Sequence, residues 1–181
     1  TRLPGDPDGY ALFASIFAEF PSLPLGFGFF LSGVGGLLCL NRGMDGEAIA
    51  AGLHDGAIDA LLFPENVLED ATFILGQLDN CFPIAPGSTA IGLAAAIDWG
   101  TPEPIITGEL GIVVSLPEGE IAVLGSVSMA LPESDPLLSL HMDTLGLIDP
   151  SNASVMVVAS LYDSSLLGTI MLSGDMATYA V

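Results

Sequence analysis

The clearest candidate for chemistry in this sequence is a histidine with an aspartate two residues after it. His141 and Asp143 lie two positions apart in LLSLHMDTLG, and side chains two apart in a strand point to the same side of a sheet. A carboxylate beside an imidazole can orient the ring for proton transfer or for weak metal binding. The sequence favours the plainer alternative, an ordinary hydrogen-bonded surface pair.

Other catalytic patterns are incomplete. A serine nucleophile of the common GxSxG type is absent, and the second histidine, His54, stands in a helical segment where a solvated or capping role is expected. Paired-carboxylate chemistry needs two acids that face one cleft. The acids that fall inside expected strands are Asp98, Glu109, Asp143 and Asp175. A hydrolase that uses them with His141 is therefore the second alternative for the function.

Metal, cofactor and redox motifs are sparse. The segments GDPDG (5–9) and IDPSN (148–152) could lend oxygen ligands to calcium, but neither has the spacing of an EF-hand loop. Cys39 and Cys81 are too few for a disulfide scaffold. We expect both to be small buried hydrophobes. No cofactor is expected.

Arg42 and Trp99 are candidate structural or binding residues. Arg42 is one of only two basic residues, and we expect it to pair with carboxylates such as Asp45 and to anchor a hairpin to a helix; an anion clamp is the alternative. Trp99 ends an expected strand beside Gly100 and is expected to pack as an anchor rather than to line a ligand site.

The charge balance limits the possible partners. Two Lys and Arg residues stand against 22 Asp and Glu, which gives a net charge of −20. Such a chain cannot neutralise phosphates, so we exclude nucleic acid and charge-driven membrane binding as partners. With 181 residues and 51% hydrophobic composition, it is long enough for one domain or for a segment of a larger protein. The compartment cannot be assigned.

The first half of the chain, 1–83, carries mainly helical patterns. Tyr10, Phe13, Phe17 and Phe20 recur every three or four residues and predict an amphipathic helix that ends at Pro21. Further helices are expected in 44–56, with Asp45 near its start and Gly56 past its end, and in 66–80, with Asn66 as its cap. Residues 21–41 are uncharged, but their glycines and prolines favour a β-hairpin over a membrane-spanning helix.

The second half, 88–181, alternates large apolar residues with small ones and predicts about six strands in an antiparallel meander. The opposite positions carry alanine and serine, with most acids in turns, so that face could accept another layer. The expected fold class is therefore α+β: an N-terminal hairpin and two to three amphipathic helices packed on the meander.

Four segments carry glycine, proline and strand-edge motifs: GFGFFLSGVGGLLCLNR (26–42), GAIDALLFPENVLEDA (56–71), IDWGTPEPI (97–105) and LYDSSLLGTIMLSGDMA (161–177). These segments resemble a family of very large, mainly bacterial proteins that carry a conserved domain of unknown function. The resemblance covers most of the chain from about Pro24, with Cys39 standing where a glycine is expected. It implies a β-rich module inside a long chain and brings no activity or catalytic residue.

The sequence favours a noncatalytic structural or assembly module of a larger bacterial protein, not an enzyme. Its partners would be other segments of the parent chain or further copies. The first alternative is a carrier with a groove for an apolar ligand such as lipid, because large apolar residues line one side of the predicted strands.

Overall fold

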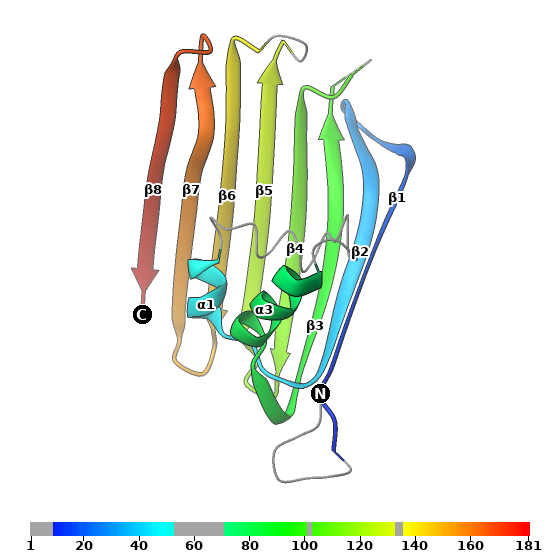
Figure 1. The fold of residues 1–181 in the computed structure, drawn as a ribbon, viewed down its shortest axis with the longest axis vertical. Coiled ribbons are helices and arrows are strands. Elements are labelled where there is room, and N and C mark those ends of the chain that lie inside the picture. The colour runs from blue at the N-terminus through cyan, green and yellow to red at the C-terminus, as the bar shows by residue number, and fades with distance from the viewer. Residues whose placement is uncertain (1–8, 53–70, 101–102, 133–135) are drawn as a thin grey trace.

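The chain folds into a single antiparallel sheet whose eight strands follow the order of the sequence (Figure 1). The computed structural model describes residues 9–52, 71–100, 103–132 and 136–181, with no side-chain description for 71–73. Each strand pairs only with its sequence neighbours. The strands are β1 (Leu12–Gly26), β2 (Phe29–Arg42), β3 (Ile84–Trp99), β4 (Ile106–Leu116), β5 (Ile121–Leu131), β6 (Leu138–Asp149), β7 (Ser154–Leu166) and β8 (Ile170–Ala180).

Two short helices, α1 (Gly46–Ala51) and α3 (Ala71–Cys81), lie against one side of this sheet (Figure 1). The carboxylate of Asp45 caps α1 by accepting a hydrogen bond from the Ala48 N–H at 2.9 Å. We call the side that carries the helices the helix face and the opposite side the apolar face. Neither of the described helices is long and apolar enough to cross a membrane.

The predicted α+β fold is wrong, because the expected hairpin and six-stranded meander are not separate parts but one continuous eight-stranded sheet, and the described helices are two short ones. The first predicted helix is the strand β1. Apolar residues occupy nearly every position there, so the segment fits both a helical and a strand period. In the sheet, Phe13 and Phe17 pack against the core under the helices, while Ile16 is exposed on the other side.

Glycines in β2 make room for this arrangement of β1. A Cβ at Gly33 would lie 2.5 Å from the Phe17 ring, and one at Gly35 would lie 2.7 Å from the Ile16 carbonyl oxygen. The predicted hairpin in 21–41 is present, but its strands extend beyond that segment. The glycine-rich pattern therefore belongs to the partner strand of β1.

Elsewhere the expected elements lie near their predicted positions. The helices α1 and α3 fall within or close to 44–56 and 66–80, whereas the predicted ends at Gly56 and Asn66 lie outside the described residues. The strands expected after Ser88 are all present, and β3 begins earlier, at Ile84. Because β3 pairs with both β2 and β4, the sheet continues through the segment where the sequence changes pattern.

The core lies between the helices and the smaller residues of the sheet. Ile49 and Leu78 from the helices pack on sheet residues that include Ala90, Ala94 and Ala122. Small side chains let a helix approach the strands closely. The remaining buried sheet residues of this cluster are Leu37, Cys39, Val113, Leu124 and Leu145.

Many of the large apolar residues of the sheet face the other way and are left exposed. Four rows of paired residues cross the apolar face, and none of their members is charged. The rows are Leu38, Ile91, Val114, Ile121, Ile148 and Val155; Gly36, Leu93, Ile112, Val123, Gly146 and Val157; Val34, Ala95, Leu110, Gly125, Thr144 and Ala159; and Leu31, Ile97, Gly108, Val127, Met142 and Leu161.

The two edge strands differ in their ability to pair further. β1 contains Pro21 and Pro24, and its register with β2 shifts between Glu19 and Leu23. Proline lacks the N–H that strand pairing requires. β8 contains no proline, and Asp175 is its only charged residue. The β8 edge is therefore the less protected one.

Candidate functional site

Two rows of polar side chains cross the helix face toward the end of the sheet where β5 ends and β6 begins. They are the polar counterpart, on the same strands, of the apolar core under the helices. We call them the polar rows. The first consists of Glu109, Ser126, Asp143, Ser160 and Asp175, and the second of Asp98, Thr107, Ser128, His141 and Tyr162.

The polar rows gather all the acids that the sequence placed inside strands, together with His141. Glu109, Asp143 and Asp175 stand in one row on alternate strands, so neighbours in this set are about 10 Å apart at the usual spacing between strands. Ser160 lies between the last two and donates a hydrogen bond to Asp175 at 2.9 Å.

His141 joins residues of three neighbouring strands. Its Nδ1 lies 2.6 Å from the Ser128 hydroxyl oxygen on β5. Its Nε2 lies 3.7 Å from Oδ1 of Asp143, an electrostatic contact that is too long for a hydrogen bond. Its ring also meets the Tyr162 ring of β7 edge to face, with centroids 4.5 Å apart. The imidazole thus stands between a hydroxyl and a carboxylate.

Asp143 is the buried member of this group, only 3% exposed. Its Oδ2 accepts a hydrogen bond from the Tyr162 hydroxyl at 2.7 Å, while its buried Oδ1 has no hydrogen-bond partner among the described residues. A carboxylate can only accept, so it favours the histidine tautomer with its proton on Nε2. Nδ1 is then the acceptor, and Ser128 donates to it.

An irregularity in β7 places Tyr162 opposite His141. Asp163 has a left-handed φ of 43°, and the pairing of β7 with β8 shifts between Leu161 and Ser164. The Ser164 hydroxyl fills the gap: it accepts from the His141 N–H at 2.8 Å and donates to the Tyr162 carbonyl at 2.8 Å. This bulge fixes the backbone around the histidine.

A cavity of about 350 Å³ adjoins the group. Ser128, His141 and Tyr162 line it with Thr107 and Asp163, as do the loop residues Pro104 and Ile105. The expected pairing of His141 with Asp143 on one face is present, at the distance given above. Sequence reasoning missed Ser128, Tyr162 and Ser164, because they reach His141 through the register between strands.

Arg42 makes contacts that join two elements of the fold. Its Nη1 donates to Asp79 at 3.0 Å and to the Phe82 carbonyl at 2.7 Å, so it ties the end of β2 to the end of α3. The expected partner Asp45 caps α1 instead. Nε of Arg42 is buried without a hydrogen-bond partner among the described residues.

The two thiols lie in the same core. Both cysteines are buried and free, as expected. Burial raises the pKa of Cys39 to about 12, with a smaller opposing effect of Arg42. Burial, and then the Asp45 carboxylate, raise the pKa of Cys81 to about 11. Neither thiol is therefore reactive near neutral pH.

Trp99 lines a cavity of about 410 Å³ on the apolar side of the β1–β2 turn. Its Nε1 donates to the Phe27 carbonyl at 3.1 Å, and its ring lies 6.4 Å from that of Phe29. The wall of the cavity is almost wholly apolar. The other lining residues are Leu25, Gly26, Ile97, Ile106, Gly108, Leu110 and Val127.

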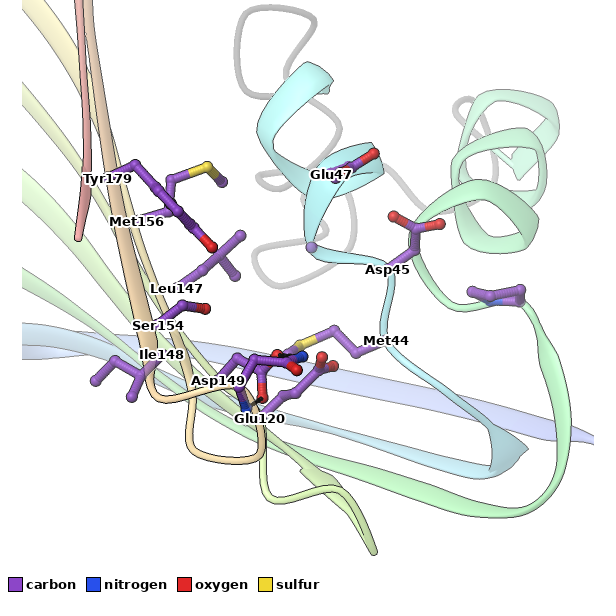
Figure 2. A pocket seen from close by; sticks show the side chains of 13 residues that line it. Met44, Asp45, Glu47, Glu120, Leu147, Ile148, Asp149, Ser154, Met156 and Tyr179 are labelled. Atoms are coloured by element: carbon purple, nitrogen blue, oxygen red, sulfur yellow. Dashed lines mark hydrogen bonds between the residues drawn. The ribbon is translucent and has the colours of Figure 1, made fainter. Parts of the chain in front are cut away.

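An acid-lined cavity of about 460 Å³ lies between α1 and the ends of β6 and β7 (Figure 2). Asp45 and Glu47 approach it from the helix side, while Glu120 and Asp149 lie at the turn side. Burial raises the pKa of Glu120, and the negative charges of Asp149, Glu118 and Asp45 raise it further.

The Asp149 carboxylate accepts hydrogen bonds from residues of its own turn. The Asn152 side chain, then the Asn152 and Ser151 backbone N–H groups, donate hydrogen bonds that lower its pKa against weak desolvation. In the part of the chain that the structure describes, no group of three His, Cys, Asp or Glu residues could hold a metal ion. Most of the other calcium candidate, GDPDG (5–9), and His54 lie outside the described residues.

A family model described as "Family of unknown function (DUF6603)" matches residues 2–181 of the chain. A search of curated proteins and a search of solved structures each found no match.

Proposed function

The chain belongs to the DUF6603 family, whose function is unknown, and we propose that it is a noncatalytic structural module whose apolar face is covered by another sheet of the same kind. In keeping with the resemblance of its motifs, we also propose that it forms a segment of a larger, bacterial protein. The observation that carries the proposal is the uncharged apolar face opposite the helices.

The exposure of this face is unusual for a surface that meets water. Leu93 is 67% exposed, and Ile91, Leu110 and Ile112 beside it are also exposed. Contiguous apolar patches on monomeric proteins rarely exceed a few hundred Å². At the usual strand spacing and rise, eight strands and four rows span about 38 Å by about 27 Å, roughly 1,000 Å².

This area matches the needs of a permanent protein interface. Two such faces in contact would bury roughly 2,000 Å² in total, the lower end of the range for obligate dimers. Face-to-face packing of sheets is also the common way in which apolar sheet faces are covered. The occupant that fits is therefore a second apolar sheet, which for the isolated chain is a second copy.

The negative charge of the chain also favours contact between two copies through their apolar faces. Each copy carries a net charge of −20, so two copies repel each other over most of their surfaces. The helix face adds to this repulsion through acids such as Glu109 and Glu120. The rows of the apolar face contain no charged residue, so contact through this face leaves the acids of both copies outside, in water.

Native mass spectrometry combined with light scattering of the purified chain tests the proposal. We expect a dimer for the natural sequence and a monomer for Leu93→Asp, which buries a carboxylate in the interface. Leu75→Asp is the matched control, because Leu75 is 62% exposed but lies on α3. A natural chain that stays monomeric at all concentrations, or a dimer that persists in Leu93→Asp, overturns the proposal.

A second candidate function is favoured by the apolar cavity at Trp99. A carrier of an apolar ligand such as lipid would place an acyl chain in this cavity and along the adjoining apolar face. The same native spectra distinguish the two functions. A monomer with a stoichiometric mass excess that organic solvent removes would support the carrier, whereas a ligand-free dimer supports the structural module.

A further inference from the structure

We propose that Ser128 is a base-activated serine that accepts acyl groups from activated esters, and that it serves as a covalent modification site rather than as a centre of rapid turnover. This inference goes beyond the structural role proposed above. It concerns the helix face, which stays outside when two apolar faces meet. It rests on the contacts of His141 and on the cavity beside Ser128.

The first step of the argument is the pairing of hydroxyl and base. The Ser128 oxygen lies 2.6 Å from Nδ1 of His141, at the short end of the distance expected for a nucleophile and its base. The buried carboxylate of Asp143 lies on the other side of the ring, 3.7 Å from Nε2. An activated nucleophile has this order of groups: hydroxyl, imidazole and an orienting third group.

The second step is the stabilisation of the imidazolium that forms when His141 takes the serine proton. Oδ1 of Asp143, which has no hydrogen-bond partner among the described residues, faces Nε2 at 3.7 Å, and Tyr162 holds the other oxygen of that carboxylate. The carboxylate thus lies beside the ring nitrogen that shares the positive charge during proton transfer. Asp143 is therefore a positioning residue for the reaction, and it touches no reagent.

The third step is access. Ser128 is part-exposed and lines the cavity of about 350 Å³, which is open to a small acyl donor. Three other serines, Ser115, Ser160 and Ser164, are at most 2% exposed and so are closed to reagents. Ser139 also lines the cavity, but the hydroxyl within 2.6 Å of the His141 ring is that of Ser128. Ser126, two residues before Ser128 on the same face of β5, pairs in register with Asp143 and not with a histidine.

The reaction balances without any further reagent. The Ser128 oxygen attacks the carbonyl carbon of the ester and forms the new C–O bond, while its proton passes to Nδ1 of His141. The bond from the carbonyl carbon to the leaving oxygen then breaks, and the leaving group takes the proton from His141. An acetyl donor thus leaves an acetyl ester on Ser128 and releases its alcohol.

The position of Ser128 in the sheet explains why the adduct should persist. β5 pairs on both sides, with β4 and with β6, so its backbone N–H groups are engaged in the ladders. In the described parts of the chain, this leaves no pair of backbone donors in β5 to stabilise an oxyanion, which is usually a large contribution to acyl transfer. We therefore expect slow acylation by reactive esters and an adduct that accumulates.

Incubation with p-nitrophenyl acetate, followed by intact mass spectrometry and peptide mapping, tests the inference. We expect one acetyl group per chain on Ser128 and no such adduct in Ser128→Ala. Ser126→Ala should label as the natural chain does. His141→Gln should slow the labelling by about 100-fold or more, the usual contribution of a general base.

The pH profile separates positioning from a general loss of structure. Labelling of the natural chain should fall in acid, since a protonated imidazole cannot take the serine proton, and Asp143→Asn should slow labelling and alter this profile. A natural chain with no acetyl group on Ser128, or labelling that His141→Gln leaves unchanged, overturns the inference. Because the readout is a mass on one residue, it does not depend on the oligomeric state and so stands apart from the test of the proposed function.

Discussion

The apolar face and the polar rows belong to the same strands but hold opposite kinds of residue. The four rows of the apolar face hold many large apolar side chains and no charged residue, whereas the polar rows hold four acids and His141. The helices lie on the helix face, over small residues such as Ala90 and Ala122. Side-chain size therefore did not mark the buried side of this sheet, and the absence of charge marks the side that needs a partner.

The sharpest test of this comparison removes a leucine from each side. Leu145 is 0% exposed in the core under the helices, and Leu145→Ala should lower the free energy of unfolding by about 2–5 kcal/mol. Leu93→Ala should change it by about 0.5 kcal/mol or less, because an exposed side chain gains little on folding. Urea unfolding measures both, at a protein concentration low enough that light scattering shows only monomer. Similar losses for the two variants would mean that the apolar face is already packed within one chain.

A second prediction concerns Arg42, which ties the end of β2 to the end of α3 beside the core. The rows of the apolar face contain no such charged residue. Arg42→Ala removes the hydrogen bonds to Asp79 and to the Phe82 carbonyl and should cost about 1.5–3 kcal/mol of unfolding free energy. Arg42→Lys, which keeps the charge, should cost less. Thermal unfolding of the two variants checks the order, and equal stability of Arg42→Ala and the natural chain would contradict it.

A substitution in the polar rows should cause a smaller loss of unfolding free energy. Tyr162→Phe takes away the hydroxyl that donates to buried Asp143 and should cost about 1–2 kcal/mol, the penalty for an unsatisfied buried acceptor. Tyr179→Phe is the control, because Tyr179 is an exposed tyrosine of the same face. If both changes cost the same in urea unfolding, the contact with Asp143 contributes nothing to stability.

The smallest effect on stability should come from a substitution in the acid-lined cavity. The pKa of Glu120 is raised in the folded chain, so the ionised carboxylate opposes folding, and this cost appears as the pH rises through that pKa. Glu120→Gln should therefore stabilise the chain near pH 7 by about 0.2–1 kcal/mol, a range suited to a partly exposed charge. The gain should vanish in acid, where Glu120 is protonated. Melting temperatures at several pH values measure it, and a gain that does not depend on pH would contradict the assignment.

The sequence predicted the strands of the second half well, because alternation with period two is a local signal. The strands β4 to β8 all lie within 88–181, the segment where strands were expected. β1 was mistaken for a helix because its apolar residues fit both periods. Alternation also defines two faces without saying which of them a helix will cover, so the exposure of the larger residues could not be predicted.

The candidate site was predictable only within one strand. His141 and Asp143 had to share a face because they lie two residues apart. Ser128 and Tyr162 join them through the pairing of β6 with β5 and with β7, and through the bulge at Asp163. Register across strands depends on the whole sheet, so no short segment of the sequence encodes these contacts.

The two edges of the sheet differ in whether a further strand can pair with them. The prolines and the shifted register of β1 hinder strand addition on that side, while β8 keeps an unbroken run of backbone donors and acceptors. Two copies could therefore pair edge to edge through β8, and the resulting sheet would end at a protected β1 strand on both sides, so edge pairing stops at two copies. A proline placed in the middle of β8 would block even this pairing.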